Sequence, residues 1–112
     1  MDISEWSVAT FETKRGEKPV DEYIKKRTPQ TKAKIIHAIR LLKLYGNMLG
    51  MPHVKTLGSG LYELRIRGKE ELRIFYCFKQ KNIYLLHAFK KQTQKTPQKD
   101  LDSTIKRMEG LT

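Results

Sequence analysis

The spacing of apolar and polar residues changes along the chain near Gly50. Before Gly50 the apolar residues mostly recur every three or four positions, which is the period of a helix with one buried face. Beyond it they alternate with polar residues, as in a strand. The predicted elements, in chain order, are a strand over 3–11, helices over 19–27 and 29–45, strands over 61–67, 72–78 and 83–89, and a helix over 98–108.

Residues that favour helix ends support these boundaries. Pro19 and Pro97 suit the starts of the first and last helices. Thr28 and Pro29 suit the N-cap and first position of the second helix, which Gly46 can close. The order β-α-α-β-β-β-α predicts an α+β fold with helices packed on one face of an antiparallel sheet. No repeat or linker divides the chain, so we expect a single domain over 1–112.

The first hairpin has a register that its pattern determines. In both strands, 61–67 and 72–78, the even-numbered positions are apolar, so pairing them on one face sends the odd-numbered positions to the other. This register places Arg65 opposite Arg73. Like charges that face each other across a sheet are destabilising, and a bound anion between the two arginines would remove that cost.

Two readings of this odd-numbered face remain open. Glu63 and Glu71 lie on it and can neutralise the arginines as an ordinary salt-bridged surface. Alternatively, the arginines bind phosphate, because the planar guanidinium group suits two-point contact with that anion. Phe75 on the same face can stack on a base or be covered by a helix, and we favour the helix.

The charge of the chain favours a polyanionic partner. The 112 residues carry 23 Lys and Arg against 12 Asp and Glu, a net charge of +11. Residues 53–99 hold eleven basic and three acidic side chains, so we expect a nucleic-acid surface there. The segment 90–97, with three lysines before a helix start, is either a phosphate contact or a solvated loop. The single cysteine, Cys77, and the lack of a long apolar run predict a cytoplasmic protein.

The histidines do not suggest a metal site. His37, His53 and His87 have no metal-ligand spacing with Cys77 or with a carboxylate pair, so we expect no metal and no cofactor. His87 lies within a predicted strand, where a buried and hydrogen-bonded role is the more common one. The chain also contains no phosphate-binding loop and no hydrolase or dinucleotide motif.

Three blocks of the sequence resemble a known family. Residues 55–65, 72–76 and 85–97 are similar to the RelE/HigB toxin superfamily, specifically its phage-derived HigB-like branch. The resemblance implies a microbial-RNase-like α+β fold and a toxin of a type II toxin–antitoxin pair. Such toxins enter the ribosome and cut mRNA without a metal. They are inhibited by an antitoxin, commonly a helix-turn-helix protein. They bind operator DNA only through this antitoxin, and no membrane partner is expected.

The resemblance also implies roles for particular residues. Arg65 matches the strand arginine that binds the scissile phosphate, and Arg73 matches a second arginine that binds phosphate or supports Arg65. The expected catalytic residues are Arg65, Arg73, Lys90 and Lys91, and the expected RNA-binding residues are Lys55, Arg67 and Lys95. The general base is open between His53, His87 and a lysine of lowered pKa.

Two other functions are compatible with the same surface. One is a noncatalytic module that binds RNA or DNA. The other is a degenerate toxin that acts only with its antitoxin in regulating their operon. RNA cleavage that requires Arg65 would distinguish the nuclease from both of these alternatives.

Overall fold

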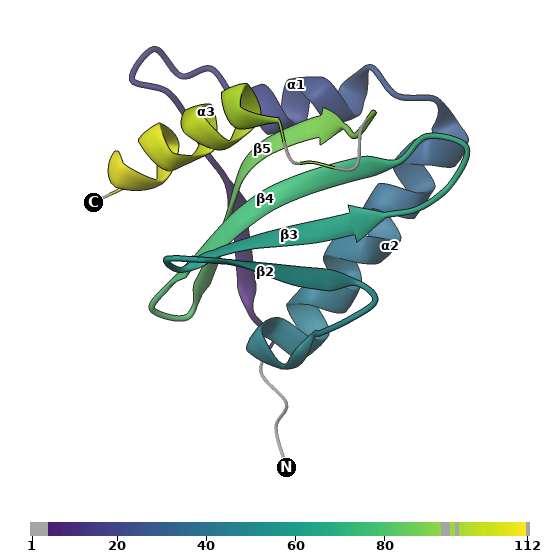
Figure 1. The fold of residues 1–112 in the computed structure, drawn as a ribbon, viewed down its shortest axis with the longest axis horizontal. Helices are drawn as coiled ribbons and strands as arrows, with labels where there is room; N and C mark the ends of the chain where they lie inside the picture. Colours follow the sequence, from purple (N-terminus) through teal and green to yellow (C-terminus); the bar gives the residue numbers. More distant parts are fainter. Residues whose placement is uncertain (1–4, 93–94, 96, 112) are drawn as a thin grey trace.

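In the computed structural model of the chain, which describes residues 5–92, 95 and 97–111, five strands form one sheet and three α-helices pack against it (Figure 1). In chain order the elements are β1 (Ser7–Thr10), α1 (Pro19–Lys25), α2 (Pro29–Tyr45), the short 3-10 helix η1 (Gly46–Met48), β2 (Val54–Gly58), β3 (Leu61–Ile66), β4 (Leu72–Lys79), β5 (Asn82–Lys90) and α3 (Gln98–Glu109). The predicted α+β class is confirmed.

The sheet has the strand order β1-β5-β4-β3-β2, in which β1 runs parallel to β5 and the other neighbours are antiparallel. The predicted order of elements is wrong in one respect, because it lacks β2. This edge strand buries only Val54 among its five residues, so it has no alternating apolar pattern. The first strand, predicted over 3–11, covers Ser7–Thr10, and positions 3 and 4 lie outside the described residues.

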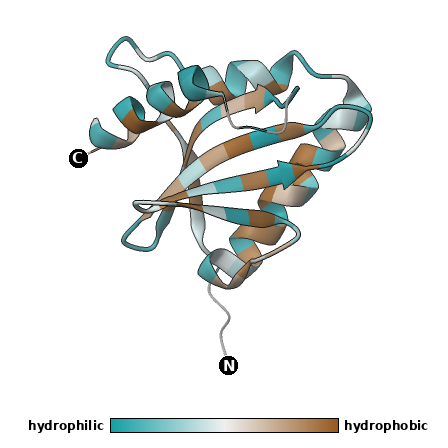
Figure 2. Ribbon diagram, in the orientation of Figure 1, coloured by the Kyte–Doolittle hydropathy of each residue, from teal (hydrophilic) through white to brown (hydrophobic). Residues whose placement is uncertain are grey.

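The helices pack on both faces of the sheet, which corrects the prediction that they share one face. Helices α1 and α2 cover the face of the even-numbered residues of β3 and β4, and α3 covers the opposite face (Figure 1). In Figure 2 the strands carry brown, apolar residues interrupted by teal, polar ones, and β4 and β5 contribute buried apolar side chains to both faces of the sheet. Phe75 is fully buried in the core beneath α3 with Leu101 and Met108, so the helix-covered reading of Phe75 is confirmed.

A β-bulge in β5 decides which side chains face α3. The β4–β5 register pairs Phe75 with His87 and then Tyr76 with Leu85, which leaves Leu86 as the extra residue. A bulge of this kind turns two consecutive side chains to the same side. Leu86 therefore joins the core under α3, and His87 follows it on the same face.

Helix α2 has the ends that its sequence predicts. The Thr28 hydroxyl accepts a hydrogen bond from the Thr31 N–H at 3.3 Å, Pro29 occupies the first turn, and Gly46 closes the helix with a φ of +52°. A Cβ atom at Gly46 would lie 2.0 Å from the Trp6 indole nitrogen. Gly46 is thus required both for its positive φ and for the close approach of Trp6.

Gly46→Ala is expected to lower the free energy of unfolding by about 2–4 kcal/mol, because it adds backbone strain to a steric clash. Urea unfolding followed by circular dichroism measures this loss. Gly50→Ala is the matched control, since nothing lies within 4 Å of a Cβ at Gly50 and its φ is not positive. Equal effects of the two substitutions would contradict the assignment.

The Cys77 thiol is expected to be unreactive in the folded protein. Burial raises its pKa, and the nearby charge of Lys79 lowers the pKa by less. At pH 8 we expect the native thiol to react with Ellman's reagent at least about a hundredfold more slowly than the same thiol in urea.

The raised pKa of Cys77 stabilises the fold at pH values below the ordinary thiol pKa of 9.0, and this contribution to stability is lost as pH rises through the pKa of the folded protein. Rapid labelling of the native protein would show that the site opens.

Candidate functional site

The two predicted arginines face each other across the central hairpin. The β3–β4 register pairs Arg65 with Arg73, as the alternating pattern predicts. Both belong to the sheet face that α3 covers in part. The helix packs over Phe75 and Phe89, toward the β5 side, and Arg65 retains 14% of its side-chain surface.

Glu63 is the counterion shared by both arginines. Its side chain is only 1% exposed, and its Oε1 atom lies 3.3 Å from Nε of Arg65 and 3.5 Å from Nε of Arg73. Among the described residues, its Oε2 atom has no hydrogen-bond partner. With Glu71, which pairs with Arg73, two arginines and two carboxylates balance, so the net positive charge of this surface comes from the neighbouring Lys55 and Arg67.

The environments of the two arginines differ. Arg73 is 7% exposed, and its Nη1 atom donates to a Glu71 carboxylate oxygen at 3.0 Å and to the Leu72 carbonyl at 2.9 Å. Arg65 contacts Glu63 through Nε, its one ion pair among the described residues, so its terminal nitrogens can bind another anion. The geometry therefore suits Arg65 for contact with a ligand and Arg73 for support of the cluster.

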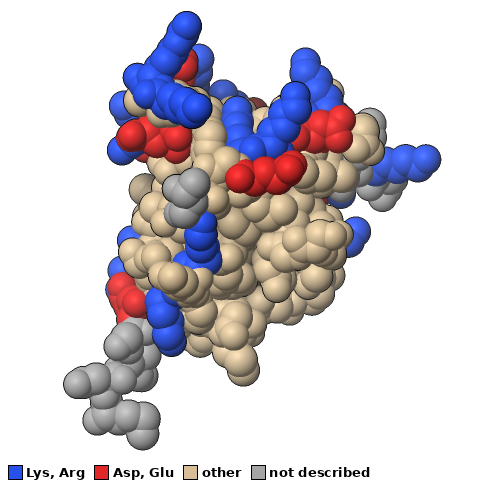
Figure 3. All heavy atoms as spheres, turned by 90° about the vertical axis from the view of Figure 1, so that its left-hand side faces the viewer, with Lys and Arg blue, Asp and Glu red and all other residues tan. Residues whose placement is uncertain are grey.

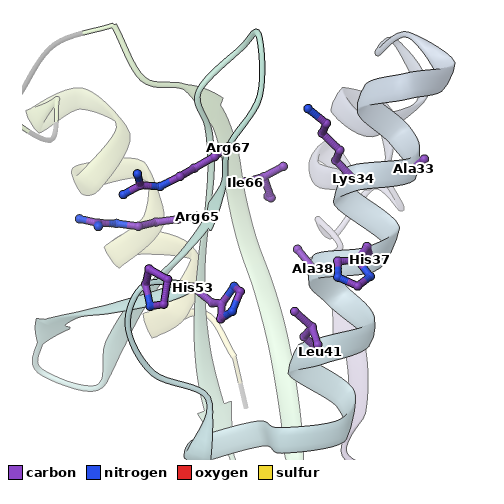
Figure 4. Close-up of a pocket in the computed structure, with 10 residues that line it drawn as sticks. Ala33, Lys34, His37, Ala38, Leu41, His53, Arg65, Ile66 and Arg67 are labelled. Carbon is purple, nitrogen blue, oxygen red and sulfur yellow. The ribbon is translucent and has the colours of Figure 1, made fainter.

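Two further predicted residues lie close to this cluster. Lys55 is exposed on β2 and pairs in register with Glu63, so it occupies the same face one strand away. Arg67 is exposed directly after β3, and its side chain points away from α2 in the same direction as that of Arg65 (Figure 4). We name the set Lys55, Glu63, Arg65, Arg67 and Arg73 the arginine face.

The structure does not bring Lys90 to the arginine face. Lys90 pairs in register with Leu72, a residue of the core beneath α1 and α2, so it belongs to the opposite side of the sheet. Its Nζ lies 3.9 Å from Glu70 in an exposed ion pair. Lys91 lies nearer to the cluster, because its N–H donates to the Glu71 carbonyl at 2.7 Å. Lys95 is exposed, and its neighbours at 93, 94 and 96 lie outside the described residues.

The side chain of His87 links β5 to α3 through Asp100 and Arg107, and we name these contacts the clamp. Its Nε2 atom lies 2.6 Å from an Asp100 carboxylate oxygen, and its Nδ1 atom accepts from the Arg107 guanidinium at 3.1 Å. Arg107 also donates to the carbonyl of Leu86, the extra residue of the bulge, at 2.8 Å. Burial lowers the pKa of Arg107. Because both ring nitrogens of His87 are engaged, this geometry favours a structural role over that of a base.

His87→Ala is expected to loosen α3. The substitution removes two hydrogen bonds to the helix, each contributing on the order of 1 kcal/mol, so the α3 amides should exchange with deuterium roughly thirtyfold faster. Hydrogen exchange measured by mass spectrometry resolves α3 from β4, which serves as the internal reference. His37→Ala, at an exposed position of α2, is the control. Unchanged protection of α3 would contradict the clamp.

A groove lies beside the arginine face, between α2 and the end of β3. It encloses about 450 Å³ (Figure 4). The residues that line it are Ala33, Lys34, His37, Ala38, Leu41, Pro52, His53, Arg65, Ile66 and Arg67. Its floor is largely apolar, its rim is basic, and none of these ten residues carries a carboxylate.

The side of the molecule that Figure 3 shows is charged unevenly. Figure 3 shows Lys and Arg side chains gathered over the upper part of one side, with a few Asp and Glu among them, while the lower right part is uncharged.

Across the described part of the chain, no group of three or more His, Cys, Asp or Glu residues is arranged to hold a metal ion. No helix in those same residues is long and apolar enough to cross a membrane.

Sequence reasoning missed the groove and the clamp. The groove depends on where β2 begins relative to the end of β3, and the sequence pattern does not predict β2. The clamp depends on the bulge at Leu86, for which the pair Leu85-Leu86 in an otherwise alternating strand is the available signal.

A protein-family model matches most of the chain. The model of a family described as "Phage derived protein Gp49-like (DUF891)" matches residues 22–109, which include α2, the whole of β2 to β5 and α3. No curated protein matches the chain.

Proposed function

Because the chain belongs to the phage-derived Gp49-like family, a family of the RelE/Gp49 toxin type, we propose that it is the toxin of a type II toxin–antitoxin pair and cuts mRNA on the ribosome. The family is associated with toxin–antitoxin systems, and this association implies an antitoxin partner. Membership supports the toxin family broadly and does not extend to the HigB branch that the sequence resembles.

The observation that carries the proposal is the Arg65 geometry. Cleavage of RNA by its own ribose requires the 2′-oxygen to bond to phosphorus while the bond from phosphorus to the 5′-oxygen breaks. Negative charge grows on the phosphate oxygens during this step, and fixed cations stabilise it. Arg65 is held through Nε by the buried Glu63, so its terminal nitrogens are oriented before the substrate arrives.

Supporting cations surround this position. We assign Arg73 to hold Glu63 and thereby Arg65, and we assign Lys55, Arg67 and Lys91 to contact the RNA backbone. Lys95 extends this set, and Lys90 is the least suited by its place on the opposite side of the sheet. The affinity for RNA should therefore fall steeply with salt.

The proton on the 2′-hydroxyl needs a base, and the leaving 5′-oxygen needs a proton donor. His53 is better placed than His87 to serve as the base. Its backbone carbonyl accepts from the Arg65 N–H at 2.8 Å, and its exposed side chain lines the groove that Arg65 also lines, whereas both ring nitrogens of His87 are engaged.

Induced expression tests the proposal. We expect growth arrest with mRNA cuts in phase with the reading frame, mapped by primer extension, and neither effect with Arg65→Ala. A helix-turn-helix antitoxin, produced together with the protein, should restore growth. Normal growth and intact mRNA with abundant folded protein would refute the nuclease and leave a binding module or a degenerate toxin.

A further inference from the structure

The sheet has an open edge next to Arg65. Along β3, the last residue that pairs with β2 is Leu64, which lies opposite Val54. The N–H of the next residue, Arg65, donates to the His53 carbonyl at 2.8 Å. Among the described residues, no strand pairs with β3 beyond this point on that side. A chain that lies on the arginine face can therefore pass over this edge to the side of the sheet where α2 lies.

The groove begins where that edge is open. Ala38, Leu41 and Ile66 give it an apolar floor, and the imidazoles of His37 and His53 enter from its two walls (Figure 4). Lys34 lies at its far end, where its ammonium approaches Gly68 of the β3–β4 loop. The volume of about 450 Å³ falls within the range of small-molecule sites, roughly 300–1,000 Å³.

We propose that this groove binds the base of a nucleotide next to the phosphate held by Arg65. The inference rests on the proposed function for the identity of that phosphate. A nucleobase has flat apolar faces, which suit the floor and can stack on imidazole rings, and polar edges, which suit the Lys34 ammonium. The adjoining phosphates would meet Arg65 and Arg67, whose side chains point to the other side of the open edge.

A second copy of the chain is a poor occupant, because each copy carries a net charge of +11 and the rim is basic. An acidic segment of a partner protein matches the charge. It does not, however, account for the two imidazoles or for the continuity of the groove with the arginine face. A nucleotide accounts for the floor, the imidazoles and the cations together.

Binding of a five-residue RNA oligonucleotide, measured by fluorescence anisotropy at low salt, tests the proposal. Each nucleotide in turn is replaced by an abasic ribose. We expect one position at which removal of the base weakens binding by about tenfold, the effect typical of a stacked base. Ala33→Trp, which fills the groove from an exposed position on α2, should cause the same loss with intact RNA and no further loss with that abasic RNA.

Matched variants separate base contact from charge. Ile36→Trp places the same ring on α2 at a residue that is 63% exposed and does not line the groove, so its binding should equal that of the unaltered protein. Ala33→Trp should keep the salt dependence of binding, whereas Arg67→Ala should reduce the slope by about one. Thermal unfolding of both tryptophan variants checks whether they are folded.

Three results would overturn the proposal: no abasic position weakens binding, Ala33→Trp binds intact RNA as well as Ile36→Trp does, or Ala33→Trp affects only neutralisation by the antitoxin. The last result would assign the groove to a protein partner. The proposed function is judged separately. Base-dependent binding without any mRNA cleavage would support base binding in the groove and contradict the proposed nuclease activity. Arg65-dependent cleavage that Ala33→Trp leaves unchanged would support the nuclease activity and contradict base binding in the groove.

Discussion

Glu63→Ala is expected to lower the free energy of unfolding by about 3–5 kcal/mol, the usual effect of removing one partner from a buried ion pair. Glu63 is 1% exposed and lies within 3.5 Å of Nε of both Arg65 and Arg73. Without it, Arg73 would remain 7% exposed with Glu71, a half-exposed carboxylate, as its remaining counterion. Urea unfolding measures the loss.

Two variants identify the cause of that loss. Glu63→Gln keeps the shape of the side chain and removes its charge, so its effect should be intermediate. Glu71→Ala removes a carboxylate that is 46% exposed, and it should cost less than about 1 kcal/mol. A loss below 1 kcal/mol for Glu63→Ala would mean that the buried carboxylate does not hold the arginines.

Arg65→Ala is expected to slow mRNA cleavage by at least about a hundredfold, in the range found when one oriented donor to a developing negative charge is removed. The effect should fall on kcat more than on KM, because many cations share the binding of the RNA backbone. Arg65→Lys should recover little of the rate, since an ammonium group lacks the planar, two-point geometry of guanidinium. Cleavage of mRNA on purified ribosomes gives these constants.

Lys90→Ala is the control for Arg65→Ala. Lys90 carries the same charge at the end of β5 but belongs to the side of the sheet where α1 and α2 pack, so its removal should change the rate only a few-fold. If Lys90→Ala and Arg65→Ala slowed cleavage equally, net charge would account for the effect and the specific geometry of Arg65 would not.

The central hairpin could be predicted because its two strands alternate strictly. That alternation determined the register and thus the pairing of Arg65 with Arg73. The edge strand β2 could not be predicted in the same way, since an exposed edge places few demands on side chains and buries only Val54. The side of the sheet that α3 covers is harder to predict, because the odd-numbered face of the hairpin mixes charged residues with Phe75 and Cys77, which are buried there.

The sequence predicts which residue types form the candidate site better than it predicts where each side chain lies. The sequence indicates the basic residues but not which of them share a face: Lys90 falls on the far side because β5 contains a bulge at Leu86. The sequence also presents Glu63 as a neutralising surface charge. In the structure it is completely buried between the neighbouring strands β2 and β4, and the side chains of Arg65 and Arg73 lie against its carboxylate.

The most direct test of the proposed function is primer extension on a defined mRNA incubated with the purified protein, with and without translating ribosomes. We expect cuts that require ribosomes, fall at a fixed position within codons, and disappear with Arg65→Ala. Intact mRNA in the presence of ribosomes, or equal cutting without them, would contradict the proposal that this protein is a ribosome-dependent nuclease.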